Sequence, residues 1–164
     1  MPEQLNIQKK EHLGHGRLII GLSGWMNGCD ISTGVVQYLI EKLDTQKSAM
    51  IDSDGFYIYN FPGSMDISAM FRPHTQIKAG IVRSFDEPAN IFFCDEKNKL
   101  VLFLGKEPNL LWRQYAECIF SLCRQFGIKQ IYFTGSVAGL VPHTRQPRIF
   151  CTVSDDKLKS ELEN

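Results

Sequence analysis

One stretch, residues 17–43, constrains the fold more than any other part of the sequence. It opens with the apolar run Leu18-Ile19-Ile20, which predicts a buried strand. Glycines at positions 21, 24 and 28 follow, and their spacing is too close for a strand or a helix to continue. From Ile31 onward apolar residues recur at every fourth position, which predicts a helix with one apolar face. The stretch therefore predicts a strand, a glycine turn and a helix, the first half of a βαβ unit.

The start and the buried face of this helix follow from the same pattern. Either Asp30 or Ser32 can accept the first free backbone N–H groups as the N-cap. The expected apolar face consists of Ile31, Val35, Leu39 and Leu43, with Val36 and Ile40 beside it. In open α/β sheets ligands bind where strand C-termini meet helix N-termini, because free N–H groups and the helix dipole favour anions. The glycine turn is therefore a candidate site, although it contains neither GxGxxG nor GxxxxGK[ST].

Beyond residue 43 strand and helix patterns continue to alternate. Strands are predicted at 48–52, 56–61, 77–85, 90–94, 100–104, 128–133 and 148–153. The polar DEKNK segment between 94 and 100 predicts a hairpin. Helices are predicted from Glu107 to a stop at Gly127 and over 155–162, with one helical turn around 66–71. The buried stripe of the longest helix is expected to contain Leu111, Tyr115, Cys118, Ile119, Leu122 and Phe126.

These elements predict an α/β fold. We expect a three-layer α/β/α sandwich around a mostly parallel mixed sheet, because strand–helix–strand units place helices on both sheet faces. Residues 17–164 are expected to form a single domain, preceded by a flexible N-terminal arm at 1–16. His12 and His15 in that arm form an HxxH pair without acidic or thiol partners, so no metal site is expected.

Charge and cysteine content exclude several classes of function. Eighteen basic and eighteen acidic residues cancel, so neither nucleic acid nor an anionic membrane is an expected partner. No apolar run approaches the roughly 20 residues that span a bilayer, and the polar N-terminus lacks a signal-peptide core. The five cysteines contain no CxxC pair, and positions 94, 118, 123 and 151 fall in apolar patterns. Buried free thiols, no structural zinc, no cofactor and a cytoplasmic location are therefore expected.

Three sequence blocks stand out: GWMNGCD at 24–30 followed by Thr33-Gly34, LGKEPNLLWR at 104–113, and VPHTR at 141–145. In combination they resemble the proteasome assembly chaperone 2 family. Together the blocks cover roughly residues 17–157 in the family's order. The resemblance implies an α/β/α sandwich similar to the nucleoside phosphorylase fold, and usually a homo-oligomer.

The candidate site residues lie in loops that would follow the C-terminal ends of parallel strands, and so would line one rim of the sheet. They offer flat apolar surface, polar contacts and charge, a mixture that suits a protein hot spot or a small polar ligand. The set is Gly24, Trp25, Asn27, Asp30, Glu107, Trp112, Ser136, His143 and Arg145. His143 has the side chain for acid–base chemistry, and Arg145 is able to clamp a phosphate.

Two hypotheses for function remain open at this point. The first is a non-catalytic protein-interaction domain of the assembly-chaperone type, which associates with itself and with another protein complex. It is favoured because no catalytic motif is complete: Ser136 follows Thr134-Gly135 rather than lying in GxSxG, and no carboxylates pair as a dyad. The alternative is a small-molecule-binding protein or enzyme that acts on a nucleoside- or phosphate-containing ligand at the rim. Its warrant is analogy at the level of the fold.

Overall fold

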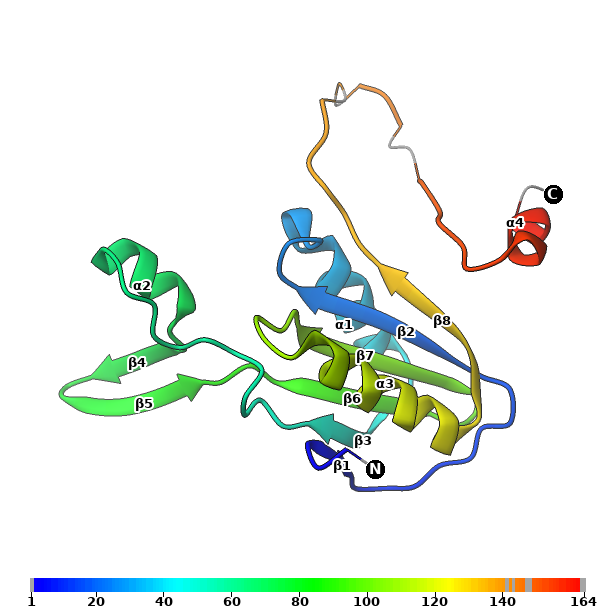
Figure 1. Ribbon diagram of the computed structural model, residues 1–164, viewed down its shortest axis with the longest axis horizontal. Coiled ribbons are helices and arrows are strands. Elements are labelled where there is room, and N and C mark those ends of the chain that lie inside the picture. Colours follow the sequence, from blue (N-terminus) through cyan, green and yellow to red (C-terminus); the bar gives the residue numbers. More distant parts are fainter. Residues whose placement is uncertain (1, 141, 143, 147–148, 163–164) are drawn as a thin grey trace.

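A computed structural model describes residues 2–140, 142, 144–146 and 149–162. Its centre is a six-stranded mixed sheet (Figure 1). The strands, in spatial order, are β1 (Leu5–Ile7), β3 (Gln46–Ile51), β6 (Asn90–Asp95), β7 (Leu100–Lys106), β2 (Gly16–Ser23) and β8 (Ile128–Thr134). β2 runs parallel to both β7 and β8, whereas the other neighbouring strands pair antiparallel.

Helices cover both faces of this sheet, which confirms the α/β prediction. α1 (Ile31–Lys42) packs on one face, where its Val36 forms a cluster with Leu102. α3 (Trp112–Phe126) packs on the other, where Tyr115 and neighbouring helix residues join a larger core with Phe103. Leu102 and Phe103 are adjacent in β7 and point to opposite faces, so the two helices form separate outer layers.

Strand directions bring the site-bearing loops to one edge of the sheet. β3 is antiparallel to β6, and β6 is antiparallel to β7, so β3 runs the same way as β7, β2 and β8. The carboxyl ends of these four strands, and the start of β6, therefore lie at the same edge. We call this edge the rim, formed by residues 23–28, 90, 105–107 and 134–136.

The contact between β2 and α1 sets which face of the helix is buried. Gly21 lies so close to α1 that a Cβ atom would be 2.5 Å from the Ser32 carbonyl oxygen and 2.7 Å from Val36. The Ser32 hydroxyl donates to the Thr134 carbonyl at 2.6 Å and accepts from the Leu22 N–H at 3.1 Å. Ser32 and Val36 are therefore buried, and Ile31 and Val35 of the predicted apolar face are exposed.

Residues near the N-terminus pack against the sheet, in contrast to the solvated arm expected from the sequence. β1 pairs antiparallel with β3, and Leu5 and Leu13 are buried. The Leu13 N–H donates to the carbonyl of Phe126 at the end of α3, at 2.8 Å. Strand pairing, backbone hydrogen bonds and two buried apolar side chains together attach this segment to the sheet.

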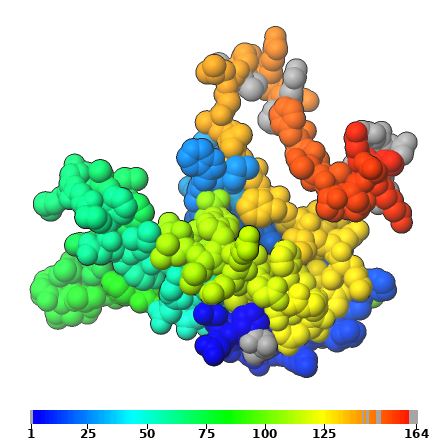
Figure 2. Space-filling view, viewed as in Figure 1, coloured from blue at the N-terminus to red at the C-terminus, as the bar shows by residue number. Residues whose placement is uncertain are grey.

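Residues 65–86 form an arm that projects from the sheet (Figures 1 and 2). It consists of α2 (Met65–Phe71) and the hairpin of β4 (His74–Lys78) and β5 (Ile81–Asp86). The sequence predicted one strand over 77–85. The chain instead turns at Ala79 and Gly80, whose φ angles of 53° and 76° lie in the left-handed region.

Two predicted strands do not form. In the first, other contacts of the backbone replace strand pairing, and in the second no neighbouring strand is present within the described structure. Residues 56–61 lie outside the strands, and the Phe56 carbonyl accepts the N–H groups of Asn109 and Leu110 at 2.8 and 3.0 Å. Residues 149–153 have strand composition but belong to no ladder. α4 (Asp156–Leu162) follows as predicted, and the Asp155 carboxylate accepts the Leu158 N–H at 3.0 Å.

Three of the four cysteines predicted to be buried are buried. They are Cys94, Cys118 and Cys123, whereas Cys151 is exposed because residues 149–153 join no sheet. Within the part of the chain that the structure describes, no helix combines the length and the apolarity needed to cross a membrane.

The buried thiols predict a loss of stability at alkaline pH. Burial raises the pKa of Cys94 to about 12 and that of Cys123 to about 11. Above the pKa of an exposed thiol, about 8.5, the unfolded chain releases these protons while the folded chain keeps them. The free energy of unfolding should therefore fall by about 1.4 kcal/mol per pH unit for each thiol, until the folded pKa is reached.

Urea unfolding from neutral pH upward measures this slope, and Cys123→Ala is the matched variant. Its stability should fall less steeply with pH than that of the unmodified chain, by about 1.4 kcal/mol per pH unit. Equal slopes for the two proteins would contradict a buried neutral thiol at this position.

Candidate functional site

The carboxylate of Glu107 anchors the glycine turn at the rim. Its Oε2 accepts the Trp25 N–H at 2.9 Å, and its Oε1 lies 3.4 Å from the Met26 nitrogen. Gly24 has a φ of 143°, and a Cβ atom there would lie 2.5 Å from Glu107 Oε2. The Glu107 N–H in turn donates to the Ser23 carbonyl at 2.9 Å. Glu107 is therefore a structural ligand of the turn, and both of its oxygens are occupied by backbone donors.

Asn27 caps α1, a function that the sequence assigned to Asp30 or Ser32. The Asn27 Oδ1 accepts the Thr33 N–H at 3.0 Å, and its Nδ2 donates to the Asp30 carboxylate at 3.1 Å. Asp30 occupies the N-cap position with a left-handed φ of 56° and makes no side-chain cap bond. The signal for this cap lies in the Asn27–Thr33 spacing, which a search limited to the residue beside the helix misses.

Ser136 ties the other side of the turn to the end of β8. Its N–H donates to the Met26 carbonyl at 2.9 Å, and its hydroxyl donates to the Gly28 carbonyl at 2.7 Å. The Gly28 N–H donates back to the Ser136 carbonyl at 3.2 Å, which completes a parallel bridge between Asn27 and Ser136. The serine hydroxyl is committed to the backbone, as expected for a residue outside a nucleophile elbow.

A buried polar cluster beneath the rim was missed by the sequence analysis. Asn90 accepts the Lys106 N–H at 3.0 Å through its Oδ1. The hydroxyls of Tyr57 and Tyr115 lie 2.9 and 3.0 Å from the same Oδ1, and 2.8 and 3.1 Å from the Lys106 carbonyl. Burial raises the pKa of both tyrosines, so both hydroxyls stay protonated as donors. The cluster holds the Lys106 peptide from both sides and so positions Glu107.

Nothing in the local sequence distinguishes this cluster. Asn90 begins an apolar strand, and Tyr115 belongs to the predicted apolar stripe of a helix. The two residues are 25 positions apart and meet only because β6 and α3 both border β7. Only the pairing of the strands reveals that a polar side chain is needed where the β6–β7 ladder ends.

The large apolar side chains near the rim point outward. Trp25 is 86% exposed although its backbone is fixed by Glu107, and Trp112 is 53% exposed at the start of α3. Leu110 and Leu111 are also exposed. The glycine turn and the segment leading into α3 lie side by side on the surface, as the Glu107 bonds require (Figure 2). These four residues form what we call the apolar rim: Trp25, Leu110, Leu111 and Trp112.

α3 begins five residues later than the sequence predicted. Leu111 adopts a left-handed φ of 53°, and the preceding N–H groups of Asn109 and Leu110 bind the Phe56 carbonyl instead of starting a helix. The Asn109 Oδ1 also accepts the Ile58 N–H at 3.1 Å. Leu111 is thereby turned out of the helix stripe and onto the surface.

The third predicted block does not join the glycine turn in the described structure. Arg145 is exposed, and its N–H closes a turn to the Pro142 carbonyl at 3.0 Å. The loop that carries it extends away from the sheet (Figure 1). His143 lies outside the described residues.

Two hollows in the described structure are lined almost entirely by residues outside the predicted site. One, of about 400 Å³, lies at the sheet edge opposite the rim and is lined by charged residues that include Lys9, Glu11 and Asp95. The other, of about 450 Å³, lies along α1, and Asp30 is its single contribution from the predicted site residues. Among the described residues, no group of three His, Cys, Asp or Glu side chains is placed to hold a metal ion.

Comparison with known proteins decides the family. The model of the PAC2 family matches residues 21–164, from the glycine turn to the last residue. The chain belongs to the PAC2 family. This confirms the resemblance found in the three sequence blocks. No curated protein matches the sequence.

Solved structures share the fold of this PAC2 chain at low identity. Rv2714 of Mycobacterium tuberculosis, a protein of unknown function, has a TM-score of 0.80 and 20% identity, covering 98% of this chain and 56% of its own. A protein of unknown function from Corynebacterium glutamicum has a TM-score of 0.67 and 22% identity, with coverages of 87% and 54%. Rv2125 of M. tuberculosis, a proteasome-assembly chaperone homologue, has a TM-score of 0.67 and 21% identity, with coverages of 79% and 52%. The chain thus spans about half the length of these relatives.

Proposed function

We propose that this PAC2 chain is a non-catalytic protein-interaction domain of the assembly-chaperone type, which forms a homo-oligomer and binds a protein partner through the apolar rim. The observation that carries the proposal is that the polar side chains at the rim are hydrogen-bonded within the protein, whereas the large apolar side chains are exposed. Glu107 and Ser136 bond backbone groups, and Asn27 bonds the Thr33 N–H and the Asp30 carboxylate, whereas the two tryptophans face solvent. Such a site offers apolar surface for binding and few free polar groups for catalysis.

The composition of the apolar rim supports a protein partner. Tryptophan is enriched in the hot spots of protein interfaces, where a few residues carry most of the binding energy. Trp25 sits on a turn held at both sides by hydrogen bonds, so little conformational entropy is lost when a partner covers it. Small-molecule sites, in contrast, are concave and enclose most of their ligand.

The relatives suggest which partner to test first. Rv2125 is a proteasome-assembly chaperone homologue, and it shares the fold. Proteasome core subunits are therefore the first candidates for a partner complex, and the buried free thiols favour the cytoplasm as the place of encounter.

The test compares Trp25→Ala with Phe120→Ala in binding to purified proteasome core subunits. Phe120 is an exposed aromatic residue on α3 outside the apolar rim, so it controls for the general loss of apolar surface. We expect Trp25→Ala to weaken binding at least tenfold, as loss of a hot spot of about 1.4 kcal/mol or more would do. Phe120→Ala should bind within twofold of the unmodified chain.

Two results would overturn this proposal. One is equal binding by all three proteins, and the other is a clear thermal shift with nucleosides, nucleotides or phosphate that Trp25→Ala abolishes. The second result would establish the alternative, a binding protein or enzyme for a nucleoside- or phosphate-containing ligand at the rim.

A further inference from the structure

The second half of β8, residues 131–133, has the composition of an interior strand. The charge and the register shift that β8 does have are confined to its first half, at Lys129. β8 is the last strand in the sheet, and β2 is its one ladder partner among the described residues. Ile131 and Phe133 pair with Leu18 and Ile20, so they lie on the α3 face, and Tyr132 lies on the α1 face. All three β8 side chains are about half exposed. Apolar side chains on both faces are typical of strands with neighbours on both sides, whereas natural edge strands carry charges or bulges.

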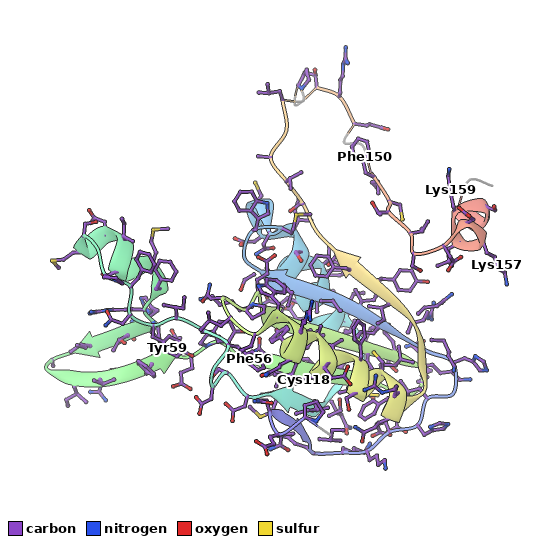
Figure 3. All side chains as sticks on the ribbon, viewed as in Figure 1. Phe56, Tyr59, Cys118, Phe150, Lys157 and Lys159 are labelled. Carbon is purple, nitrogen blue, oxygen red and sulfur yellow. The ribbon has the colours of Figure 1, made fainter. Side chains whose placement is uncertain are left out.

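A second segment, residues 149–153, has the composition of a strand but lies in no sheet. Residues 149–153, Ile-Phe-Cys-Thr-Val, are rich in β-formers and follow the extended loop after β8, yet they belong to no ladder. Ile149 is 95% exposed and Phe150 is 86% exposed. Figure 3 shows Phe150 on an extended segment that stands apart from the sheet. The segment therefore exposes a large apolar side chain on each of its two sides.

We propose that residues 149–153 of one copy pair with the outer edge of β8 in a second copy, and that the exchange is reciprocal. This inference rests on the homo-oligomer of the proposed function and assigns its interface. A reciprocal exchange supplies the missing ladder partner to both unpaired elements of each chain at once. It also closes a twofold dimer, the commonest symmetry of soluble oligomers.

The side-chain pattern of the two strands is complementary. In an extended conformation Ile149, Cys151 and Val153 point to one side and Phe150 to the other. When the first group lies on the α3 face beside Ile131 and Phe133, Phe150 falls on the α1 face beside Tyr132. Cross-strand aromatic and β-branched pairs of this kind stabilise a ladder. The backbone hydrogen bonds of the new ladder add to this without depending on sequence.

The β8 of a second copy is a better partner for residues 149–153 than the β8 of the same chain. The structure holds residues 149–153 away from their own β8, on a loop that arches outward (Figure 1). An outward, exposed arm with an apolar end is the geometry from which strand exchange between copies proceeds.

Light scattering over a hundredfold range of concentration tests the exchange. The unmodified chain should form a dimer. The double variant Ile149→Asp/Phe150→Asp should run at the monomer mass, with a dimer Kd raised at least a hundredfold. Leu140→Asp is the control, because Leu140 is fully exposed in the same loop but outside the pairing segment. It should keep the dimer.

Each contrary result has a distinct meaning. A dimer that survives the double substitution would overturn the exchange and leave the homo-oligomer standing on another surface. A monomer for the unmodified chain at every concentration would overturn both. Loss of the dimer in Leu140→Asp as well as in the double variant would point to a general effect of added charge and would also refute the specific pairing.

Crosslinking separates exchange from pairing within one chain. Cys151 is an exposed free thiol in the exchanged segment, and Cys29 is the other exposed thiol among the described residues. In a Cys29→Ser background, Ile131→Cys treated with a short bismaleimide should give a covalent dimer through Cys151. A crosslinked monomer, formed equally at high dilution, would show that the segment pairs with its own β8 and would sink the proposal.

Discussion

Replacing Gly21 with alanine is expected to lower the free energy of unfolding by about 3 kcal/mol, the upper part of the usual range for overpacked cores. The added methyl group would lie 2.5 Å from the Ser32 carbonyl oxygen and 2.7 Å from Val36 Cγ2. A backbone oxygen inside α1 cannot rotate away as a flexible side chain does, so the whole helix must shift from β2. For a chain of this size the melting temperature should fall by about 6–12 °C.

Gly34 in α1 provides a control of the opposite sign. Apart from its chain neighbours and the backbone of its own helix, no described atom lies within 4 Å of the position its Cβ would take. Alanine there removes the entropic cost of a glycine in a helix and should raise the free energy of unfolding by about 0.5–1 kcal/mol. Urea unfolding of both variants measures the contrast. If Gly21→Ala proved as stable as Gly34→Ala, the close approach between β2 and α1 would be refuted.

The same contact shows where prediction from sequence stops. The strand, glycine turn and helix over 16–42 follow from local spacing, and the structure has all three. The rotation of α1 does not follow, because Val35 and Val36 are equally apolar and adjacent in sequence. What buries Val36 and exposes Val35 is the approach of Gly21 on β2, together with the hydrogen bonds of Ser32 to β2 and β8. Both are contacts between residues that are far apart in the sequence or on different elements.

The candidate site divides in the same way. Proximity of the glycine turn, Glu107 and Ser136 was predictable, since parallel strands end at one edge. The roles of these residues were not, because a carboxylate or hydroxyl that looks free for chemistry becomes a backbone ligand once the loops meet. Strand composition at 149–153 likewise predicts an element whose partner strand no local pattern can supply.

Asn90→Leu is the variant that tests how the rim is supported from below. It removes the acceptor of the Lys106 N–H, and the leucine side chain cannot replace it. The two tyrosine hydroxyls keep the Lys106 carbonyl, so the loss is limited to about 2 kcal/mol for a buried donor left without a partner. The melting temperature should fall by about 4–8 °C.

A structural loss alone would not distinguish support of the rim from support of the core, so amide hydrogen exchange is the deciding readout. The N–H of Trp25 is protected by Glu107, and Glu107 follows the Lys106 peptide that Asn90 holds. In Asn90→Leu the Trp25 amide should exchange faster while amides in the middle of β7 remain protected, because opening is local.

Asn98→Leu is the matched control, since Asn98 lies in the turn between β6 and β7, far from the rim, and its amide donates to the buried Asp95 carboxylate at 2.6 Å. It should also lower stability, by about 1–2 kcal/mol, because Asp95 keeps only the Asn98 backbone N–H of this pair, and it should leave exchange at Trp25 unaltered. Unchanged exchange at Trp25 in Asn90→Leu as well would mean that the turn holds its tryptophan independently of the buried cluster. The preorganisation of the apolar rim would then depend on Glu107 and Ser136 alone.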